Sequence, residues 1–474
     1  MQRREFLKRS VVTSSWLLTG CGGGGTSSSG INSDIINNDL NKLAIPELLM
    51  GRDVDGVKHY DLTIQKSIHK FFDAFDTVTY AINSTYLGPT LKLVHGEFVS
   101  LNYTNNLDEP TTMHGHGMHV PANMDGAAHQ VIASGERWSS QYRVNQRAST
   151  NWYHPHLMGK TAEHVYKGLA GLIIIEDDEI NALDLPKTYG VDDIPLVVQD
   201  RFFDANGAID YSPTRREIMH GYNGDIHIVN GVRNAYVDVE AKEIRFRILN
   251  GSNSSVYNFS FSNETLFKQI ATDNSLLNSP VRMTSLRLSP AERAEIVVDF
   301  SSLNGKSLTL SNGIVNILKI NVKALTTTPT ITPTRLTTLS KFSLTDAVRT
   351  RIFTLSASGS SDFRINGVSM NMEVINEHVP LDQVEIWEVV NSMNMNHNFH
   401  IHATHFTIAE RNGSASNVLD NEQGYKDTVF LAPNDSVKLL IKMVDYSDST
   451  LPYMYHCHFL EHEDAGMMGQ FTVE

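Results

Sequence analysis

The stretch HCHFLEHEDAGMMGQF, residues 456–471, places a cysteine between two histidines and adds a third histidine and two methionines downstream. In a β-strand, residues two apart point to the same face. The imidazoles of His456 and His458 should therefore lie side by side, while the Cys457 sulfur points to the opposite face. His462 and Met467 follow within ten residues. This stretch predicts two metal sites, one on each face of a single strand.

Three other His-x-His pairs occur along the chain. They are His114/His116, His154/His156 and His400/His402. With 20 histidines among 474 residues, chance would give about one such pair. A single pair is most often a chance occurrence on the protein surface, but four pairs predict a shared metal cluster. Imidazole is a good ligand for copper.

The cysteine belongs to a second donor set. His397 lies three residues before the first histidine of the pair at positions 400 and 402, so it should face away from that pair and toward Cys457. With His462 and Met467, these residues would supply a thiolate, two imidazoles and a thioether. Such a donor set is typical of a blue-copper electron-transfer centre. Taken alone, Cys457 would be a buried structural thiol and Met467 a core residue.

Composition and charge narrow the class of protein. A length of 474 residues is enough for about three domains. The net charge of −14 would repel phosphate backbones and anionic lipid, so we expect no nucleic acid among the partners. Cations are better candidates. Cys21 and Cys457 are the only cysteines, and because Cys21 belongs to the leader, no structural disulfide is expected.

The N-terminus predicts export. Arg3 and Arg4 precede a short apolar run and resemble a twin-arginine signal over residues 1–21. The run is shorter than the roughly 20 residues that span a bilayer. Residues 18–21, LTGC, resemble a lipoprotein cleavage box, which predicts a lipid anchor at Cys21 and a flexible tether over residues 22–42. The alternative is an ordinary signal peptide with an incidental cysteine. We expect the mature protein in the periplasm or anchored to a membrane facing outward.

Strand signals recur from residue 45 onward. Short runs rich in Val, Ile, Thr, Phe and Tyr alternate with Gly, Asn, Asp and Pro, which is typical of β-sandwiches. The expected strands include Asp76–Ile82, Lys92–Tyr103, Gly171–Glu176, Ile244–Leu249, Ala294–Phe300 and Val437–Lys442. The Thr- and Pro-rich segment 326–340 reads as a linker. We therefore expect three domains, at residues 43–180, 190–325 and 341–474.

Several motifs resemble those of the multicopper oxidases, particularly the three-domain bacterial branch that contains periplasmic cuprous oxidases and spore-coat laccases. They are TTMHGHGMHVPANMDG (111–126), WYHPHLMGKTAEHVYKGLAGLIIIED (152–177), IRFRILNGSNSSVYN (244–258), LSPAERAEIVVDF (288–300), NHNFHIHATHF (396–406) and YHCHFLEHEDAGMMGQFTV (455–473). The resemblance spans nearly everything after the leader. It implies an all-β fold of three cupredoxin-like Greek-key β-sandwich domains.

The resemblance also implies four copper ions and their ligands. Type 1 copper would be held by His397, Cys457, His462 and axial Met467. Type 2 copper would be held by His114 and His400. The type 3 pair would be held by His116, His154, His156, His402, His456 and His458. The cluster would then lie between the first and third domains, with the middle domain as a spacer, and the backbone from Cys457 to its histidine neighbours would carry electrons between the sites.

Two acidic residues match positions of the family that supply protons for water formation, namely Asp125 and Glu463. Without the resemblance, each would be an exposed charge or a support for a ligand. Two departures from the family also occur. Gly115 stands where close relatives often carry Trp, a departure expected to open space near the cluster without removing a ligand. The methionine-rich insert of the cuprous oxidases is absent before Asp362.

These features predict an enzyme that couples four one-electron oxidations to the reduction of dioxygen to water, in the manner of a laccase. The reductant would be a phenolic or aromatic compound, or Cu(I), Fe(II) or Mn(II), and the chain should act as a monomer. Met393 and Met395, spaced to share a strand face, suggest a Cu(I) entry site. The alternatives are a metallo-oxidase acting mainly on Cu(I) in copper tolerance and a non-catalytic copper-binding or division-associated protein, although such members lose ligands that this chain keeps. A two-domain copper nitrite reductase fits poorly with four His pairs.

Overall fold

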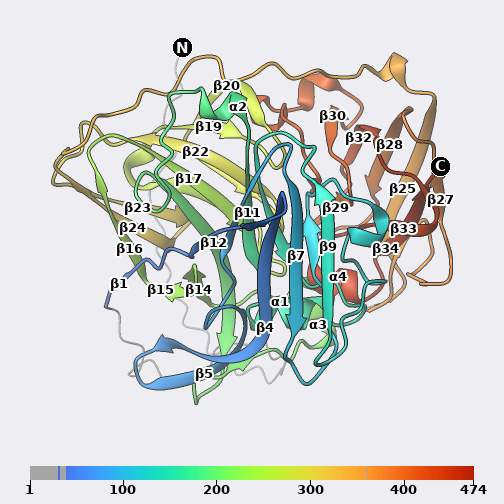
Figure 1. The fold of residues 1–474 in the computed structure, drawn as a ribbon, viewed down its shortest axis with the longest axis horizontal. Coiled ribbons are helices and arrows are strands. Elements are labelled where there is room, and N and C mark those ends of the chain that lie inside the picture. The colour runs from blue at the N-terminus through green and yellow to red at the C-terminus, as the bar shows by residue number, and fades with distance from the viewer. Residues whose placement is uncertain (1–29, 32–38, 360) are drawn as a thin grey trace, which may run out of the picture.

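The computed structural model describes residues 30–31, 39–359 and 361–474. The strands in this part of the chain form six sheets, and these pack in pairs around three hydrophobic cores as three β-sandwiches (Figure 1). The all-β expectation is confirmed. We propose that the sandwiches correspond to the three expected domains. Arg3, Arg4, Cys21 and most of the expected tether lie outside the described residues.

The first sandwich carries the first two His-x-His pairs. One sheet, in ladder order, contains β2 (Leu48–Met50), β6 (Thr90–Val94), β11 (Gly171–Glu176), β10 (Ser149–His154) and β8 (His114–His116). The other contains β3 (Arg52–Val54), β4 (Val57–Phe72), β7 (Phe98–Asn105) and β9 (Arg137–Arg143), with β5 (Phe75–Ile82) paired to β4. The histidine strand β8 therefore lies at the edge of its sheet.

The middle sandwich has the larger sheets. One contains β15 (Val232–Arg233), β14 (Ile226–Val229), β12 (Asp193–Phe203), β17 (Glu243–Asn250), β22 (Arg293–Asp299), β19 (Phe267–Ala271) and β20 (Leu276–Met283), with β13 (Ile209–Asp210) paired to β12. The other contains β1 (Asn41–Lys42), β16 (Ala235–Glu240), β24 (Val315–Lys323), β23 (Ser307–Asn312), β18 (Tyr257–Phe261) and β21 (Ser285–Leu288). Both β12 and β17 are buried along their whole length, as expected for central strands covered on both faces.

The third sandwich carries the remaining metal-binding motifs. One sheet contains β26 (Phe363–Ile365), β25 (Arg349–Ala357), β28 (Val384–Asn391), β32 (Ser436–Lys442) and β30 (Phe406–Arg411). The other contains β27 (Glu377–Val379), β34 (Met468–Val473), β33 (Asp448–His456), β29 (His397–Ile401) and β31 (Thr428–Leu431). The motif strands β29 and β33 are neighbours in this second sheet.

Helices are few and short. The α-helices are α1 (Thr161–Lys167), α2 (Asp178–Asn181), α3 (Arg215–His220) and α4 (Leu460–Asp464). The 3-10 helices are η1 (Ala122–Met124), η2 (Ser262–Glu264), η3 (Leu344–Asp346), η4 (Ala415–Asn417) and η5 (Asp420–Glu422). In the described residues no helix is both long and apolar enough to span a bilayer.

Two expectations need correction. The run Lys92–Tyr103 is not one strand, because a turn at Gly96, with φ of +87°, divides it into β6 and β7 in different sheets. The tether also ends earlier than residue 42, because Asn41 and Lys42 form β1, which pairs in parallel with β16. A two-residue strand is too short to show periodicity in the sequence.

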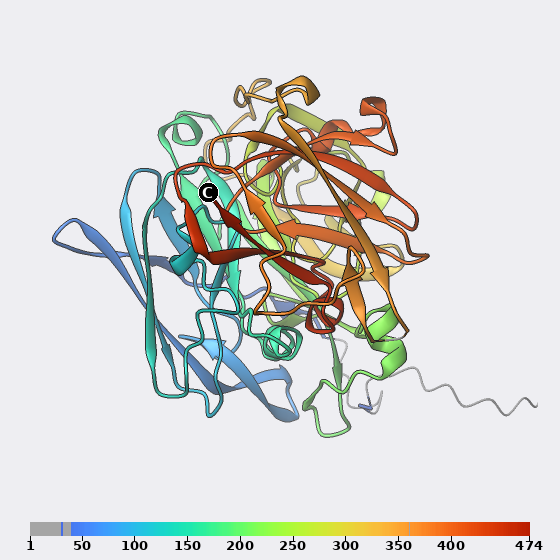
Figure 2. The same cartoon turned by 90° about the vertical axis from the view of Figure 1, so that its right-hand side faces the viewer.

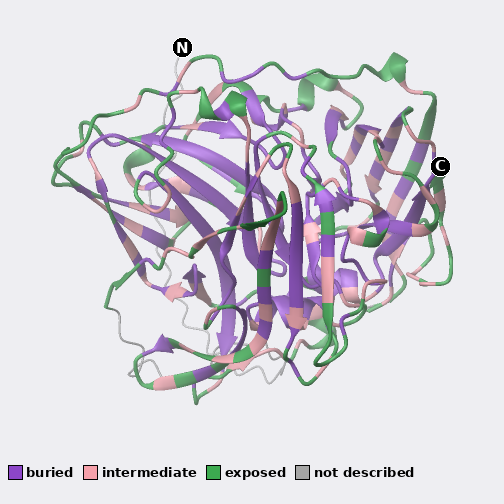
Figure 3. Ribbon diagram, viewed as in Figure 1, coloured by how far each residue is buried: buried purple, intermediate pink, exposed green. Residues whose placement is uncertain are grey.

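The three sandwiches are arranged around a common centre. In Figure 1 the middle sandwich, green to yellow, lies to the left and the third, orange to red, lies to the right, with strands of the first in front. Figure 2 shows the first and third sandwiches side by side, and Figure 3 shows that the central strands of the middle sandwich are largely buried. Residues 326–340 contain no helix or strand and run along the outside, although Leu336 is buried.

Candidate metal centre

Cys457 and two histidines form a compact group inside the third sandwich. His397 begins β29, Cys457 directly follows β33, and His462 lies in α4. The Cys457 sulfur is 3.5 Å from His397 Nδ1 and 3.8 Å from His462 Nδ1, and the two nitrogens are 3.2 Å apart. Metal bonds of about 2.0–2.1 Å to nitrogen and about 2.3 Å to sulfur would space three trigonal ligands about 3.5–3.8 Å apart. The triangle therefore fits a metal ion at its centre.

Burial gives these side chains the ionisation states that suit a cation. Burial lowers the pKa of His462 to about 3 and that of His397 well below its usual value, so both imidazoles are neutral and keep a lone pair. Burial also raises the pKa of the Cys457 thiol to about 12. A thiolate at this position therefore needs a bound cation to balance its charge.

Met467 is held beside this group through its main chain. Its N–H donates to the His462 carbonyl at 2.9 Å, and its carbonyl accepts from the Cys457 N–H at 3.1 Å. The Met467 side chain is fully buried. The structure therefore brings together all four residues of the predicted donor set.

The two methionines upstream are arranged differently from the expectation. Residues 393–395 form a bend between β28 and β29, so Met393 and Met395 do not lie on a strand. The Met393 sulfur lies 3.2 Å from His397 Nε2. Met395 lines a cavity of about 520 Å³ that also reaches His462. Met393 and Met395 are both half-buried between exposed neighbours, so the alternation expected of a strand persists although the backbone is not a strand.

Eight further histidines converge where the first and third sandwiches meet, and all are buried. Strand register explains the convergence, because β8 pairs with β10 so that His114 lies opposite His154, and β29 pairs with β33 so that His400 lies opposite His456. The eight are His114, His116, His154, His156, His400, His402, His456 and His458. Each sandwich supplies four of them.

Hydrogen bonds on the outer side fix the orientation of several rings. His114 Nδ1 lies 2.8 Å from the Asp125 carbonyl, and His400 Nδ1 lies 2.9 Å from the Asp427 carbonyl. His402 Nδ1 lies 2.7 Å from Asp125 Oδ2. These oxygens can only accept, so each Nδ1 carries the proton and each Nε2 keeps a lone pair turned inward.

Close contacts between nitrogens define one group of three rings. His456 Nε2 lies 3.1 Å from both His156 Nε2 and His402 Nε2. His456 Nδ1 lies 3.1 Å from the Cys457 carbonyl oxygen and therefore carries the proton. The Nε2 atom of His456 thus keeps a lone pair, as Nε2 of His402 does. Facing lone pairs at this distance repel one another, and a cation between them removes the repulsion. These three rings also form one of the groups able to hold a metal ion.

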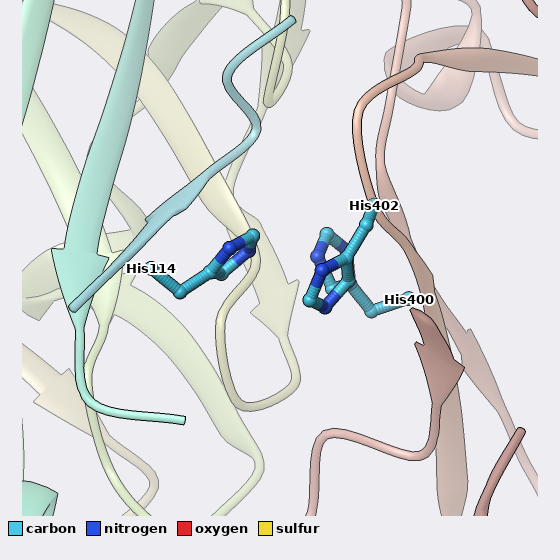
Figure 4. Close-up of side chains that lie close together, drawn as sticks. All are labelled: His114, His400 and His402. Carbon is cyan, nitrogen blue, oxygen red and sulfur yellow. The ribbon is translucent and has the colours of Figure 1, made fainter. Parts of the chain in front are cut away.

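A second group and a facing pair complete the arrangement. His154 Nε2 lies 3.4 Å from both His116 Nδ1 and His458 Nε2. The remaining two rings, His114 and His400, have buried Nε2 atoms without a hydrogen-bond partner. In Figure 4 His114 approaches from the first sandwich and His400 faces it from the third, with His402 alongside. Unpaired buried nitrogens are costly, and a metal ion between them would satisfy both.

The two predicted acidic residues lie at this cluster. Asp125 Oδ1 is 3.4 Å from His114 Nδ1, in addition to the contact of Oδ2 with His402. Glu463 Oε2 is 3.1 Å from His456 Nδ1. Burial would raise the pKa of Glu463, but the nearby His456 and His156 outweigh burial and lower it to about 2. Neither carboxyl is an exposed surface charge.

Gly115 does not open space beside the cluster. A Cβ at this position would lie 3.0 Å from Cγ of Met118 and 3.3 Å from its Cβ. Met118 therefore occupies the region that a side chain at 115 would enter, and a large residue such as Trp would have to displace it.

Sequence reasoning missed two buried charged residues behind the cluster. The Asp427 carboxylate lies 3.0 Å from His116 Nε2, and it forms two hydrogen bonds with Arg293 of the middle sandwich. Arg293 stands within the motif LSPAERAEIVVDF, but no local pattern there marks it as a functional residue. Its 134-residue separation from Asp427 leaves no local signal of the contact.

Comparison with known proteins agrees with this geometry. Models of the multicopper oxidase family match residues 63–180, 219–332 and 333–474. The chain belongs to the multicopper oxidase family. The multicopper oxidase mco of Staphylococcus haemolyticus is 36% identical over 439 residues, covering 91% of this chain and 92% of its own length. The three sandwiches are thus the cupredoxin-like domains of a copper-containing oxidoreductase.

Two other relatives of this chain have names that describe different activities. A laccase from Pediococcus acidilactici has a similar structure, with a TM-score of 0.86 and 32% identity, covering 92% of this chain and 94% of that one. The cell division protein FtsP of Xenorhabdus nematophila is 34% identical over 451 residues, covering 91% of this chain and 92% of its own. Family membership alone therefore leaves the substrate open.

Proposed function

We propose that this multicopper oxidase couples one-electron oxidations of a small reductant to the reduction of dioxygen to water. The observation that carries the proposal is the convergence of eight buried histidines beside the Cys–His–His triangle, with inward lone pairs that lack partners at His114 and His400. A protein that bound no metal would gain nothing from this arrangement, because buried imidazoles facing one another are destabilising.

We assign four coppers to these residues. The triangle and axial Met467 would hold type 1 copper, and the facing pair His114 and His400 would hold type 2 copper. The two groups of three rings support the assignment of the type 3 pair to His116, His154, His156, His402, His456 and His458. Bound copper would supply one-electron redox couples.

The chain itself would connect the two sites. Cys457 is joined by peptide bonds to His456 and His458, so a single stretch of backbone links the triangle to both groups of three rings. Electrons could cross by this covalent path without a moving part. The acidic residues Asp125 and Glu463 are placed to deliver protons on the cluster side.

The cavity beside the triangle favours an organic compound as the reductant. Its volume of about 520 Å³ lies in the range of about 300–1,000 Å³ of small-molecule sites. Asn223, Asn312, Asn394 and Asn396 supply amide groups, and no aspartate or glutamate occurs among its described lining residues. A neutral phenolic or aromatic compound would find hydrogen bonds there, whereas a divalent cation would find no carboxylate. We therefore favour a laccase-like activity.

A second candidate, oxidation of Cu(I), is favoured by the methionine contacts. Thioethers are soft ligands that suit Cu(I). The Met393 sulfur touches His397, and Met395 lines the cavity. Fe(II) and Mn(II) prefer harder ligands than thioethers, so this observation favours Cu(I) over them.

The two candidates can be separated with the double variant Met393→Leu/Met395→Leu. If the methionines admit Cu(I), its oxidation falls much further than phenol oxidation, and the blue absorption persists. The double variant Met370→Leu/Met372→Leu is the matched control, because those methionines have the same spacing but pack against Met454 and Met468. Equal losses toward phenol and Cu(I), or no loss, would reject a methionine-built entry site.

A non-catalytic role of the kind suggested by the FtsP relative is the remaining alternative. The retained ligands favour the oxidase, because a purely structural protein has no use for a complete donor set. Dioxygen uptake with a phenol, Cu(I), Fe(II) and Mn(II) in turn would decide between them. Copper-loaded protein that consumes no dioxygen with any of these reductants would support the non-catalytic role.

We also propose that the protein is exported in folded form, with a lipid anchor at Cys21, and acts as a monomer. The order of Arg3, Arg4 and the LTGC box in the sequence supports this. Changing both arginines to lysine should block export, and mass spectrometry of the mature N-terminus should find acyl chains on Cys21. An N-terminus that begins beyond Cys21 would remove the anchor and leave export standing.

A further inference from the structure

The ring of His116 is oriented the opposite way from those of three other cluster histidines. His114, His400 and His402 direct Nδ1 to an outer acceptor and Nε2 inward. His116 instead directs Nε2 outward, 3.0 Å from Asp427 Oδ1, while its Nδ1 faces His154 at 3.4 Å. Because a carboxylate only accepts, His116 must carry its proton on Nε2 to present a lone pair to the cluster.

Asp427 is buried, so its carboxylate needs a compensating charge. Arg293 Nη1 donates to Oδ1 at 2.7 Å and Arg293 Nη2 donates to Oδ2 at 2.6 Å, which is the paired geometry in which guanidinium and carboxylate bind most strongly. The Thr428 hydroxyl adds a hydrogen bond to Oδ1 at 2.9 Å. The carboxylate is thereby held in one orientation toward His116.

Arg293 also joins the three sandwiches. It begins β22 in the middle sandwich, and its Nε donates to the Thr150 carbonyl on β10 of the first at 2.9 Å. Its Nη2 donates to Asn151 Oδ1 on the same strand at 2.9 Å. Strand β10 ends at His154, so one guanidinium is hydrogen-bonded both to the strand of one cluster histidine and to the carboxylate behind another.

We propose that Arg293, from the sandwich that supplies no histidine, is a positioning residue for the metal cluster, acting through Asp427 to fix the tautomer and orientation of His116. The middle sandwich is then more than a spacer. The inference rests on the proposed copper cluster, and it predicts a specific consequence, because loss of such outer partners commonly lowers metal affinity or activity by about 10- to 100-fold.

The chain offers a matched control in Arg247. This arginine is also buried in the middle sandwich and also reaches the first, donating to Thr150 Oγ1 at 2.8 Å. It pairs with Asp193 and Glu295. In the described part of the chain, neither of these carboxylates bonds to a cluster histidine. Arg247→Lys therefore removes a comparable contact between sandwiches without disturbing His116.

The experiment measures copper binding to the folded protein by equilibrium competition with a chelator, together with the spectra of each site. Arg293→Lys keeps the charge but loses the paired geometry. We expect its cluster copper to bind about 10- to 100-fold more weakly, with altered type 2 resonance and type 3 absorption, while the blue absorption is retained. Asp427→Asn, which preserves shape, should give the same pattern, and the double variant should lose no more than either single one.

Three results would overturn the inference: unchanged cluster affinity and spectra in Arg293→Lys, the same weakening in Arg247→Lys, or additive losses in the double variant. Asp427→Asn keeps the test decisive if Arg293→Lys fails to fold. Copper binding to the wild-type protein distinguishes failure of the proposed function from failure of the positioning role. If the wild-type protein binds no copper at the histidines, the proposed function fails, whereas normal wild-type binding with unaltered Arg293→Lys rejects only the positioning role.

Discussion

At the scale of single residues, alternation along two strands sorts the ligands. Cys457 and His397 face the triangle, whereas the histidines two apart on the same segments face the cluster. The pattern was predictable because a strand has a period of two whatever its surroundings. The orientation of His116 was not predictable, because it depends on Asp427 and Arg293, which are distant in sequence.

Replacing Cys457 with serine should abolish the blue colour. A hydroxyl is a harder and far weaker donor than a thiolate, so the triangle would lose both its copper and its charge-transfer absorption. Copper at the histidine cluster should remain. Visible spectroscopy and metal analysis of the loaded protein provide the measurement, and a wild-type protein that binds copper in full yet shows no thiolate absorption would contradict the assignment.

Asp125→Asn and Glu463→Gln should slow dioxygen reduction while the blue colour persists. Each change keeps the size of a side chain that contacts cluster histidines but removes a group able to pass protons. The loss should grow at higher pH, where protons are scarcer. Steady-state rates across pH, followed with one reductant, test this. Unchanged turnover in both variants would restore a purely supporting role for the two acids.

At the scale of elements, the short helices carry more of the function than the sequence suggested. The strand period was visible because many strands alternate, as in β16 and β25. Helix α3 has few residues and no buried position, so it left no helical period to read. Yet its Met219 carbonyl lies 3.3 Å from His462 Nε2, and Met219 and His220 line the cavity.

Thr214→Ala should loosen α3 and alter the cavity. Thr214 and Glu217 form a capping box, and loss of an N-cap costs about 1 kcal/mol. We expect faster hydrogen exchange in α3 and a higher KM for an organic reductant, with little change in Tm because α3 buries no residue. Ser343→Ala is the control, because Ser343 occupies the N-cap position of η3 and does not line the cavity. Equal effects of both variants on KM would argue against a role for α3 in the cavity.

At the scale of the whole molecule, the cluster lies on an interface. The first and third sandwiches each contribute four histidines, whereas the triangle lies within the third alone. Composition and motifs predicted three sandwiches, but the packing that brings β8 and β29 together depends on contacts between distant segments. Among these is Asp464, which accepts from the N–H groups of Thr161 and Ala162 at the start of α1.

Removing copper should therefore lower the stability of the folded protein, mainly because the interface between the first and third sandwiches loses its cluster copper. A ligand that binds only the folded state stabilises it by about 2.7 kcal/mol at 100 times its Kd. Calorimetry should show a lower Tm for copper-free protein, with cluster copper accounting for most of the difference. Cys457→Ser loaded with cluster copper should thus unfold close to the wild type. A Tm that responds only to the copper at Cys457 would contradict an interface cluster.

The central claim is that the cluster reduces dioxygen fully to water. The most direct measurement follows dioxygen with an electrode and the oxidised reductant by absorbance in the same reaction, with a peroxide assay alongside. We predict four one-electron oxidations per dioxygen consumed and no accumulating hydrogen peroxide. A ratio of two with stoichiometric peroxide, or no dioxygen consumption by fully copper-loaded protein, would contradict this account.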